Sequence, residues 1–255
     1  MSGTRHHVEI RANTILPARR RPVELRTADG LSLVGELALP PDRDPAAVLV
    51  TLHPLPTHGG SSDSHLLRKA AWRLPALADV AVLRFNTRGT TGSLGQSEGR
   101  FDGGRGECLD VAAAMAFTTA VGPRWLLGWS FGADLLLRYG PDPAISGAIL
   151  LSPPLRTAGT EELQVWAEAR TPLLALVPEL DDYLRPDHAR ERFALVDRAE
   201  VIGVEGARHL WTGERAVRRV FDEVIARIRP DAVPLPTSWA GAVETAQIPG
   251  GGGPG

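Results

Sequence analysis

The sequence predicts an α/β fold in which helices cover both faces of a mostly parallel sheet. Strands alternate with helices after an initial hairpin, which is the order that builds parallel sheets. The strands of the alternating part are nearly continuous apolar runs, such as AVLVTL at 47–52, as expected for strands buried on both faces. The length of 255 residues suits one large domain. We expect this domain at 22–229, a polar N-terminal arm at 1–21 and a flexible Pro/Gly-rich tail at 230–255.

Composition and charge restrict the class of protein. Hydrophobic residues make up 43% and charged residues 23%, which is ordinary for a globular chain. The net charge of −2 gives no reason to expect nucleic acid or an anionic membrane surface as a partner. The single cysteine, Cys108, excludes an intrachain disulfide. The chain also has neither the apolar segment of a signal peptide nor a run suited to span a bilayer. We therefore expect a cytoplasmic protein, with its oligomeric state left open.

The elements follow one another regularly along the chain. Asp29-Gly30, a strong turn signal, joins the two strands of an opening hairpin at 23–27 and 31–39. Pro75 is expected to break or kink the first helix. The last helix has a clear amphipathic pattern and can be capped by Thr212. The further predicted strands lie at 47–52, 80–86, 125–127, 148–152, 172–177 and 199–204, and the helices at 64–74, 109–117, 133–139, 161–169, 187–195 and 212–228.

The motif G-W-S-F-G at 128–132 lies between a predicted strand and a predicted helix. This context is typical of a nucleophile elbow, a sharp turn that exposes a serine hydroxyl. We therefore expect Ser130 to be a nucleophile and the backbone N–H of Phe131, at the helix start, to stabilise an oxyanion. A second match, G-Q-S-E-G at 95–99, has neither flanking element, so we interpret Ser97 as a loop serine. The alternative for Ser130 is a small residue at a tight turn.

A serine nucleophile needs a histidine base oriented by a carboxylate. His209 follows the last predicted strand, where catalytic groups of such sheets gather. The carboxylate is Asp181 or Asp182, after the strand at 172–177, which gives the order Ser…Asp…His.

A metal site is not expected. His53 and His58 share a loop that should lie beside the site, and Asp63 is the nearest further ligand, but their spacing matches no zinc pattern. The mechanism needs no organic cofactor either.

The chain resembles the α/β-hydrolase superfamily over about 23–229, and more narrowly a group of small bacterial predicted hydrolases related to dienelactone hydrolases. The superfamily resemblance rests on the segments 128–132 (GWSFG), 179–182 (ELDD) and 206–209 (GARH), and the narrower one on 53–60 (HPLPTHGG), 84–89 (RFNTRG) and 97–102 (SEGRFD).

The resemblance implies further roles. It favours Asp181 over Asp182 as the acid of the triad, and it implies that the N–H of Leu55 is the second oxyanion donor. Leu55 itself departs from the group, which usually reads HPHP here, and Pro178 stands where a glycine is usual. Dienelactone hydrolases use a cysteine nucleophile where this chain has Ser130, so their substrate is not carried over.

The connection at 153–171 is too short for a helical cap, which predicts an open site with little or no lid. Trp129, Trp211 and Tyr183 are expected to form an apolar wall for a small-molecule acyl substrate, and ordinary packing in the interior is the alternative for them. The function we expect is a serine hydrolase that cleaves a carboxylic ester through an acyl-enzyme. Two alternatives remain open: a hydrolase of amides or thioesters, and a non-catalytic binding or scaffold protein on the same fold.

Overall fold

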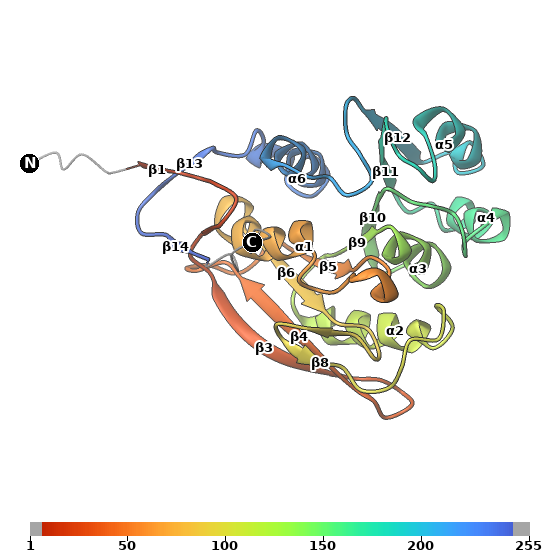
Figure 1. Ribbon diagram of the computed structural model, residues 1–255, viewed down its shortest axis with the longest axis horizontal. Coiled ribbons are helices and arrows are strands. Elements are labelled where there is room, and N and C mark those ends of the chain that lie inside the picture. Colours follow the sequence, from red (N-terminus) through yellow and green to blue (C-terminus); the bar gives the residue numbers. More distant parts are fainter. Residues whose placement is uncertain (1–6, 247–255) are drawn as a thin grey trace, which may run out of the picture.

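A computed structural model describes residues 7–246 and confirms the predicted α/β class. Eight strands form the main sheet: β3 (Arg19–Arg26), β4 (Ser32–Leu39), β5 (Ala47–Leu52), β6 (Val80–Phe85), β9 (Arg124–Trp129), β10 (Ile145–Leu151), β11 (Leu173–Pro178) and β12 (Ala199–Val204). Their spatial order is β12-β11-β10-β9-β5-β6-β4-β3 (Figure 1). Neighbours from β12 to β6 run parallel, and the predicted N-terminal hairpin, β3 and β4, joins them as an antiparallel edge.

The register of the central strands brings their carboxyl ends together. Leu52 of β5 pairs with Gly128 of β9, and Trp129 of β9 pairs with Leu151 of β10. The residues that follow these three strands therefore meet at one edge of the sheet, where ligands bind in open α/β sheets.

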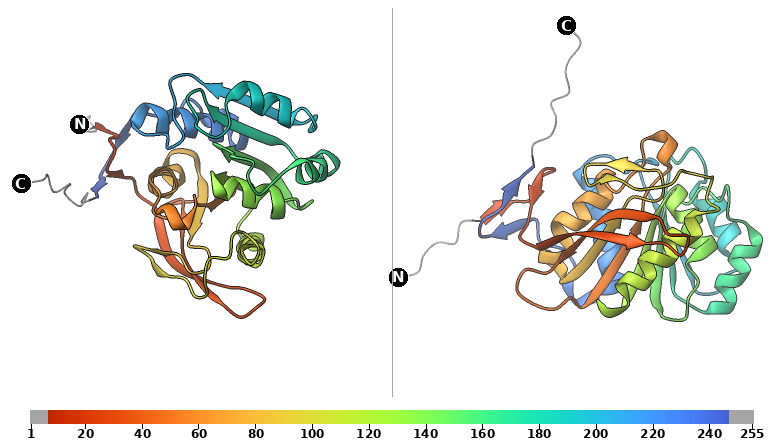
Figure 2. Two further views of the ribbon diagram at one scale, coloured as in Figure 1. Left: turned by 45° about the vertical axis from the view of Figure 1, so that its right-hand side comes forward. Right: turned by 90° about the horizontal axis from the view of Figure 1, so that it is seen from below.

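Helices cover both faces of the sheet (Figures 1 and 2). One face packs against α1 (His65–Ala78) and α6 (Glu214–Ile228), and the other against α2 (Glu107–Phe117), α3 (Phe131–Tyr139), α4 (Thr160–Ala169) and α5 (Pro186–Phe193). Side chains of one strand alternate between the two cores: Leu49 belongs to the first and Val50 to the second. Both are fully buried, which explains why the sequence of this strand is apolar throughout.

Helix α1 continues through Pro75 to Ala78, so of the two expected effects of this proline, a break or a kink, the break is absent. A proline inside a helix leaves the carbonyl four residues earlier without its usual donor. That carbonyl belongs to Ala71, and Nη2 of Arg20 on β3 donates a hydrogen bond to it at 3.2 Å. The tertiary contact satisfies the group that the proline leaves free, which no local sequence rule could reveal.

The connection between β10 and β11 contains a loop and the single helix α4. This confirms the expectation of little or no lid. Among residues 7–246, no helix has both the length and the apolar content needed to cross a bilayer. The remaining small elements are η1 (Pro56–His58), the hairpin of β7 (Thr91–Gly92) and β8 (Gly95–Gln96), and η2 (Thr118–Ala120).

The two ends of the described chain pair with each other. Strand β1 (His7–Glu9) pairs with β13 (Ser238–Ala240), and β2 (Thr14–Ile15) pairs with β14 (Glu244–Thr245), beside α1 and α6 (Figures 1 and 2). A 3-10 turn, η3 (Pro230–Ala232), links α6 to this pairing.

This pairing corrects the expected domain boundaries. The boundary at residue 22 falls inside β3, and Trp239, which we interpreted as part of a flexible tail, is paired with Val8. These four strands are short and their partners lie more than 200 positions away in the sequence, so no local sequence pattern predicts them. The expectations for 1–6 and 247–255 lie outside the described residues.

Candidate active site

Ser130 occupies the tight turn between β9 and α3, with φ 54° and ψ −118°. A residue other than glycine in this region is strained, and such strain is characteristic of functional sites. The turn also needs its two glycines. A Cβ on Gly128 would lie 2.3 Å from the carbonyl oxygen of Gly132, and one on Gly132 would lie 2.2 Å from that of Leu52. The sequence G-W-S-F-G thus fits a close crossing of two strands and a helix.

Ser130, His209 and Asp181 form a hydrogen-bonded chain. The hydroxyl Oγ of Ser130 lies 2.9 Å from Nε2 of His209, and Nδ1 of His209 lies 2.9 Å from Oδ2 of Asp181. An ionised carboxylate can only accept, so Nδ1 carries the proton and Nε2 is free to accept from the serine. The structure therefore brings together the three residues that the sequence singled out, in the arrangement of a catalytic triad.

Asp181 is the carboxylate that faces His209, whereas Asp182 is exposed. Burial by itself raises the pKa of Asp181, but the hydrogen bonds from His209 and from the N–H of Tyr183 outweigh it and lower that pKa. Oδ1 accepts from Tyr183 N at 2.9 Å and from Leu184 N at 3.4 Å. Backbone donors and the imidazole thus keep the carboxylate ionised and fix its orientation.

Buried side chains hold the loop that carries His209 through hydrogen bonds to its backbone. Trp129 Nε1 donates to the carbonyl of His209 at 3.2 Å, and Oγ of Ser152 donates to the same oxygen at 3.2 Å. Trp211 Nε1 in turn donates to Oγ of Ser152 at 2.9 Å. Nε2 of His65 donates to the carbonyl of Leu210 at 2.7 Å, and the His65 ring packs edge-on against the indole of Trp129.

Two of the three expected substrate-wall residues are therefore reassigned. Trp129 is 2% exposed and Trp211 0%, so neither presents a face to a ligand. Both belong instead to the core on the α1 and α6 side of the sheet, where their indole N–H groups bind the carbonyl of His209 and Oγ of Ser152. Tyr183 differs: it is 53% exposed, and its ring centroid lies 4.7 Å from that of His209, beside the open side of the triad.

The two expected oxyanion donors lie on elements that touch. Phe131 is the first residue of α3, where backbone N–H groups have no intrahelical acceptor. Leu55 lies in the loop after β5, and the same close approach of Gly132 to Leu52 brings this loop to the start of α3. Within residues 7–246, neither N–H donates to a backbone acceptor.

His53 fixes the loop of Leu55 rather than binding a ligand. Its Nδ1 donates to the carbonyl of Pro54 at 2.7 Å, and its Nε2 accepts from the N–H of Thr87 at 3.1 Å. Complete burial lowers the pKa of His53 to about 4, so the ring is neutral at physiological pH. His58 is exposed, and the described part of the chain holds no group of three or more His, Cys, Asp or Glu residues able to bind a metal.

Ser97, from the second G-x-S-x-G match, is a buried residue whose hydroxyl connects two backbone segments. Its side chain is fully buried; Oγ donates to the carbonyl of Asn86 at 2.7 Å and accepts from the N–H of Val34 at 3.1 Å. Both partners belong to the hairpin side of the sheet, away from His209. The hydroxyl of Ser97 has no base beside it.

Sequence reasoning missed the supporting residues of the site. Ser152 and His65 had a weak signal in the sequence, since the first follows a central strand and the second begins a helix at the same edge of the sheet.

Glu107 had no such signal in the sequence. It is fully buried, and its Oε2 accepts from the N–H of Gly104 at 2.9 Å. Burial and a hydrogen bond with the carboxylate of Asp102 raise the pKa of Glu107 to about 7. The same loop rests on the elbow through an edge-to-face contact of Phe101 with Phe131.

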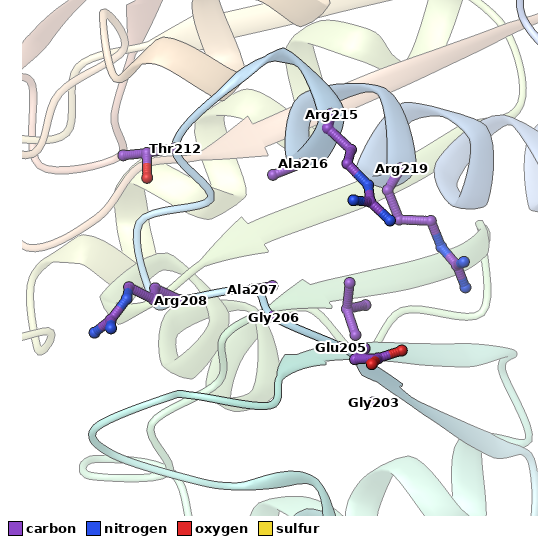
Figure 3. A pocket seen from close by; sticks show the side chains of 10 residues that line it. Gly203, Glu205, Gly206, Ala207, Arg208, Thr212, Arg215, Ala216 and Arg219 are labelled. Atoms are coloured by element: carbon purple, nitrogen blue, oxygen red, sulfur yellow. The ribbon is translucent and has the colours of Figure 1, made fainter.

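A cavity of about 740 Å³ borders the far side of the His209 loop, between the end of β12 and the first turns of α6. Figure 3 shows Arg215 and Arg219 projecting from α6 on the side of Glu205, with Arg208 at the opposite end. Ser130 does not line this cavity, so it lies beside the triad rather than over the nucleophile.

Comparisons with known proteins agree with this fold. No protein-family model matches the chain. An uncharacterised protein of Rickettsia prowazekii (strain Madrid E), RP471, is 29% identical over 154 residues, which cover 57% of this chain and 61% of that protein. The matched region thus spans about three fifths of the curated relative.

Solved structures match over a larger share. XC6422 of Xanthomonas campestris, described as an α/β serine hydrolase without lid, is 24% identical with a TM-score of 0.68, over 87% of this chain and 99% of that one. ATU1826 of Agrobacterium tumefaciens, a putative α/β hydrolase of unknown function, is 25% identical with a TM-score of 0.66, over 85% and 100%. The Pyrococcus furiosus esterase Pf2001 is 18% identical with a TM-score of 0.66, over 83% and 89%. This chain has the α/β-hydrolase fold and resembles the α/β-hydrolase superfamily, as its sequence motifs indicated.

Proposed function

We propose that this protein is a serine hydrolase that cleaves a carboxylic ester of a small molecule through an acyl-enzyme. The observation that carries the proposal is the continuous hydrogen-bonded chain from Ser130 through His209 to Asp181, with both distances at 2.9 Å. A serine hydroxyl is a poor nucleophile until a positioned base takes its proton. The strained turn at Ser130 adds support, because a purely structural small residue has no need of it.

The reaction follows from the roles of the three groups. Oγ of Ser130 attacks the carbonyl carbon while Nε2 of His209 takes its proton, and the negative charge that develops on the carbonyl oxygen is stabilised by the N–H groups of Phe131 and Leu55. His209 then gives the proton to the leaving alcohol, which leaves the acyl group on Ser130. Water, deprotonated by the same Nε2, releases the acid. Asp181 stabilises the imidazolium at both stages.

An ester is the substrate class best supported by the surroundings. The short connection after β10 leaves the triad without a cap, and an exposed Tyr183 borders it. Alcohols are better leaving groups than amines, so an ester is a less demanding substrate for this triad than an amide. The description of the Pyrococcus furiosus protein as an esterase agrees with this choice.

The test is labelling with a fluorophosphonate probe beside hydrolysis of 4-nitrophenyl butyrate. Wild type should take the label and hydrolyse the ester, and Ser130→Ala should do neither while keeping its fold by circular dichroism. Ser97→Ala is the matched control, since it changes the other G-x-S-x-G serine. It should lose about 1–3 kcal/mol of stability through its broken hydrogen bonds, yet keep the label.

Absence of label from folded wild type would refute the proposal. Labelling that persists in Ser130→Ala would refute the assignment of the nucleophile.

A further inference from the structure

The loop after β10 is anchored by a buried carboxylate on the helix that begins at the nucleophile. Oδ2 of Asp134, in the first turn of α3, accepts from the N–H of Arg156 at 2.9 Å and from the N–H of Thr157 at 2.8 Å. Asp134 is 1% exposed, and its other oxygen, Oδ1, has no partner within the described residues. A carboxylate buried at this cost, rather than an apolar residue, indicates that the path of this loop matters.

The anchor controls the residues on either side of it. Leu155, directly before Arg156, has φ 49°, a strained value for leucine, and packs against the core on the α3 side of the sheet. With its N–H held by Asp134 and its neighbour packed, the backbone of Arg156 has one position. The position of the backbone from which the Arg156 side chain extends is thereby set by the core.

The side chain of Arg156 extends towards the triad. Its guanidinium carbon lies 5.3 Å from the ring centroid of Tyr183, and the Tyr183 ring lies 4.7 Å from that of His209. The backbone of Tyr183 is held to the triad, because its N–H donates to Oδ1 of Asp181. An arginine therefore lies one aromatic ring away from the base of the triad.

Arg156 is exposed and forms no ion pair with any of residues 7–246. The N–H donors of a guanidinium lie in one plane, which matches the two oxygens of a carboxylate. The ring contact reduces the freedom that the side chain would lose on binding. Both features prepare the cation for an anionic ligand at the mouth of the site.

We infer that Arg156, supported by Tyr183, binds a carboxylate on the substrate, so that the preferred substrates are esters that also carry a free carboxylate. This inference rests on the proposed function and names the substrate class of the same site. Asp134 is then a positioning residue, which acts only through the loop that carries Arg156.

The test compares esters that differ only in charge. One pair carries the charge on the acyl side, 4-nitrophenyl hemiglutarate against the isosteric 4-nitrophenyl 5-methylhexanoate. The other carries it on the alcohol side, 4-(butyryloxy)benzoate against its methyl ester. In at least one pair, wild type should show a kcat/KM about fivefold higher for the charged ester, the size of effect expected of one exposed ion pair. High salt should reduce this preference.

Variants of single residues test whether Arg156 is the source of the preference for the charged ester. Arg156→Gln should bring the ratio of kcat/KM for the charged ester to kcat/KM for the neutral ester close to one. Arg156→Lys should keep part of the preference, since the charge remains without the planar guanidinium. Asp134→Ala should reduce the ratio as well, because the N–H groups of Arg156 and Thr157 lose their acceptor. Arg185→Gln is the matched control: Arg185 is also exposed, lies after β11 at the same edge of the sheet, and should leave both rates unchanged.

The outcomes separate the two proposals. If wild type takes the fluorophosphonate label and hydrolyses the neutral esters, but prefers neither charged ester or keeps its preference in Arg156→Gln, the inference is wrong and the hydrolase proposal stands. If wild type takes no label and hydrolyses none of the esters, both fall together.

Discussion

Replacing Asp181 by asparagine tests the triad with a minimal change of shape. In the variant, the amide oxygen can keep the position of Oδ1 and accept from the N–H of Tyr183. The amide nitrogen then takes the position of Oδ2, where it can only donate to Nδ1 of His209. The proton of the imidazole moves to Nε2, which no longer accepts from Ser130. The side chains stay in place, but the base is in the wrong tautomer.

The expected loss is large. The same carboxylate-to-amide change in a serine-histidine-aspartate triad lowers kcat by about 10⁴-fold, which corresponds to about 5 kcal/mol of transition-state stabilisation. Little of this should be recovered by solvent, because the side chain of Asp181 is only 1% exposed and water cannot replace the carboxylate. The pKa of Asp181 is lowered in the folded protein, so the wild-type carboxylate is ionised throughout the neutral range and the loss should be similar from pH 6 to 9.

The assay is kcat/KM for 4-nitrophenyl butyrate, with the free energy of unfolding measured in urea for each variant. Asp182→Asn is the control, since it makes the same chemical change one residue later on an exposed side chain. It should stay within twofold of wild type. Folded Asp181→Asn within tenfold of wild type, or a larger loss in Asp182→Asn, would refute the assignment of the acid.

Three further predictions concern the turn and the loop that rests on it. Ser130→Gly should be more stable to urea than Ser130→Ala by about 1 kcal/mol, because only glycine relieves the strain at φ 54°; equal stability would show that the turn stores none. Gly132→Ala should cost about 3 kcal/mol, because its Cβ would meet a backbone oxygen at 2.2 Å, whereas Gly159→Ala, with its nearest atom at 3.8 Å, should be tolerated; similar urea midpoints for the two variants would contradict this. The free energy of unfolding should fall by about 1–3 kcal/mol as the pH rises from 5 to 8, because the raised pKa of Glu107, about 7 beside Asp102, means that the folded state binds more protons than the unfolded state. Glu107→Gln should flatten this dependence in urea titrations, and an unchanged slope would exclude Glu107 as its source.

Much of the fold was predictable because its signals are local. Apolar runs of six residues, such as the one at 47–52, identify strands buried on both faces, and the amphipathic pattern around Val220 identifies α6. The nucleophile could be selected because an elbow needs a strand before the serine and a helix after it, and only Ser130 has both. His209 and Asp181 followed from their positions after parallel strands, whose ends meet at one edge.

The rest depended on contacts between distant segments. Whether Trp129 faces a ligand or the interior is decided by the packing of the His209 loop, and the sequence places the two residues 80 positions apart. The continuation of α1 through Pro75 needs Arg20 from another strand. The anchoring of Arg156 by Asp134 is likewise invisible locally, since both residue types are common on surfaces and only burial distinguishes this pair.

The pairing of β1 with β13 has a consequence for synthesis. His7 and Ser238 lie 231 positions apart, so β1 has no partner until the residues that separate it from β13 have been synthesised. The central sheet, whose strands all lie between 19 and 204, can assemble earlier, as domains fold while the chain emerges. Because the central sheet is then already formed, the pairing of β1 with β13 is a late step, and it contributes little stability, since the paired strands are only two or three residues long. Until β13 has been synthesised, the growing chain exposes β1 without its partner, and another chain could pair with this strand instead.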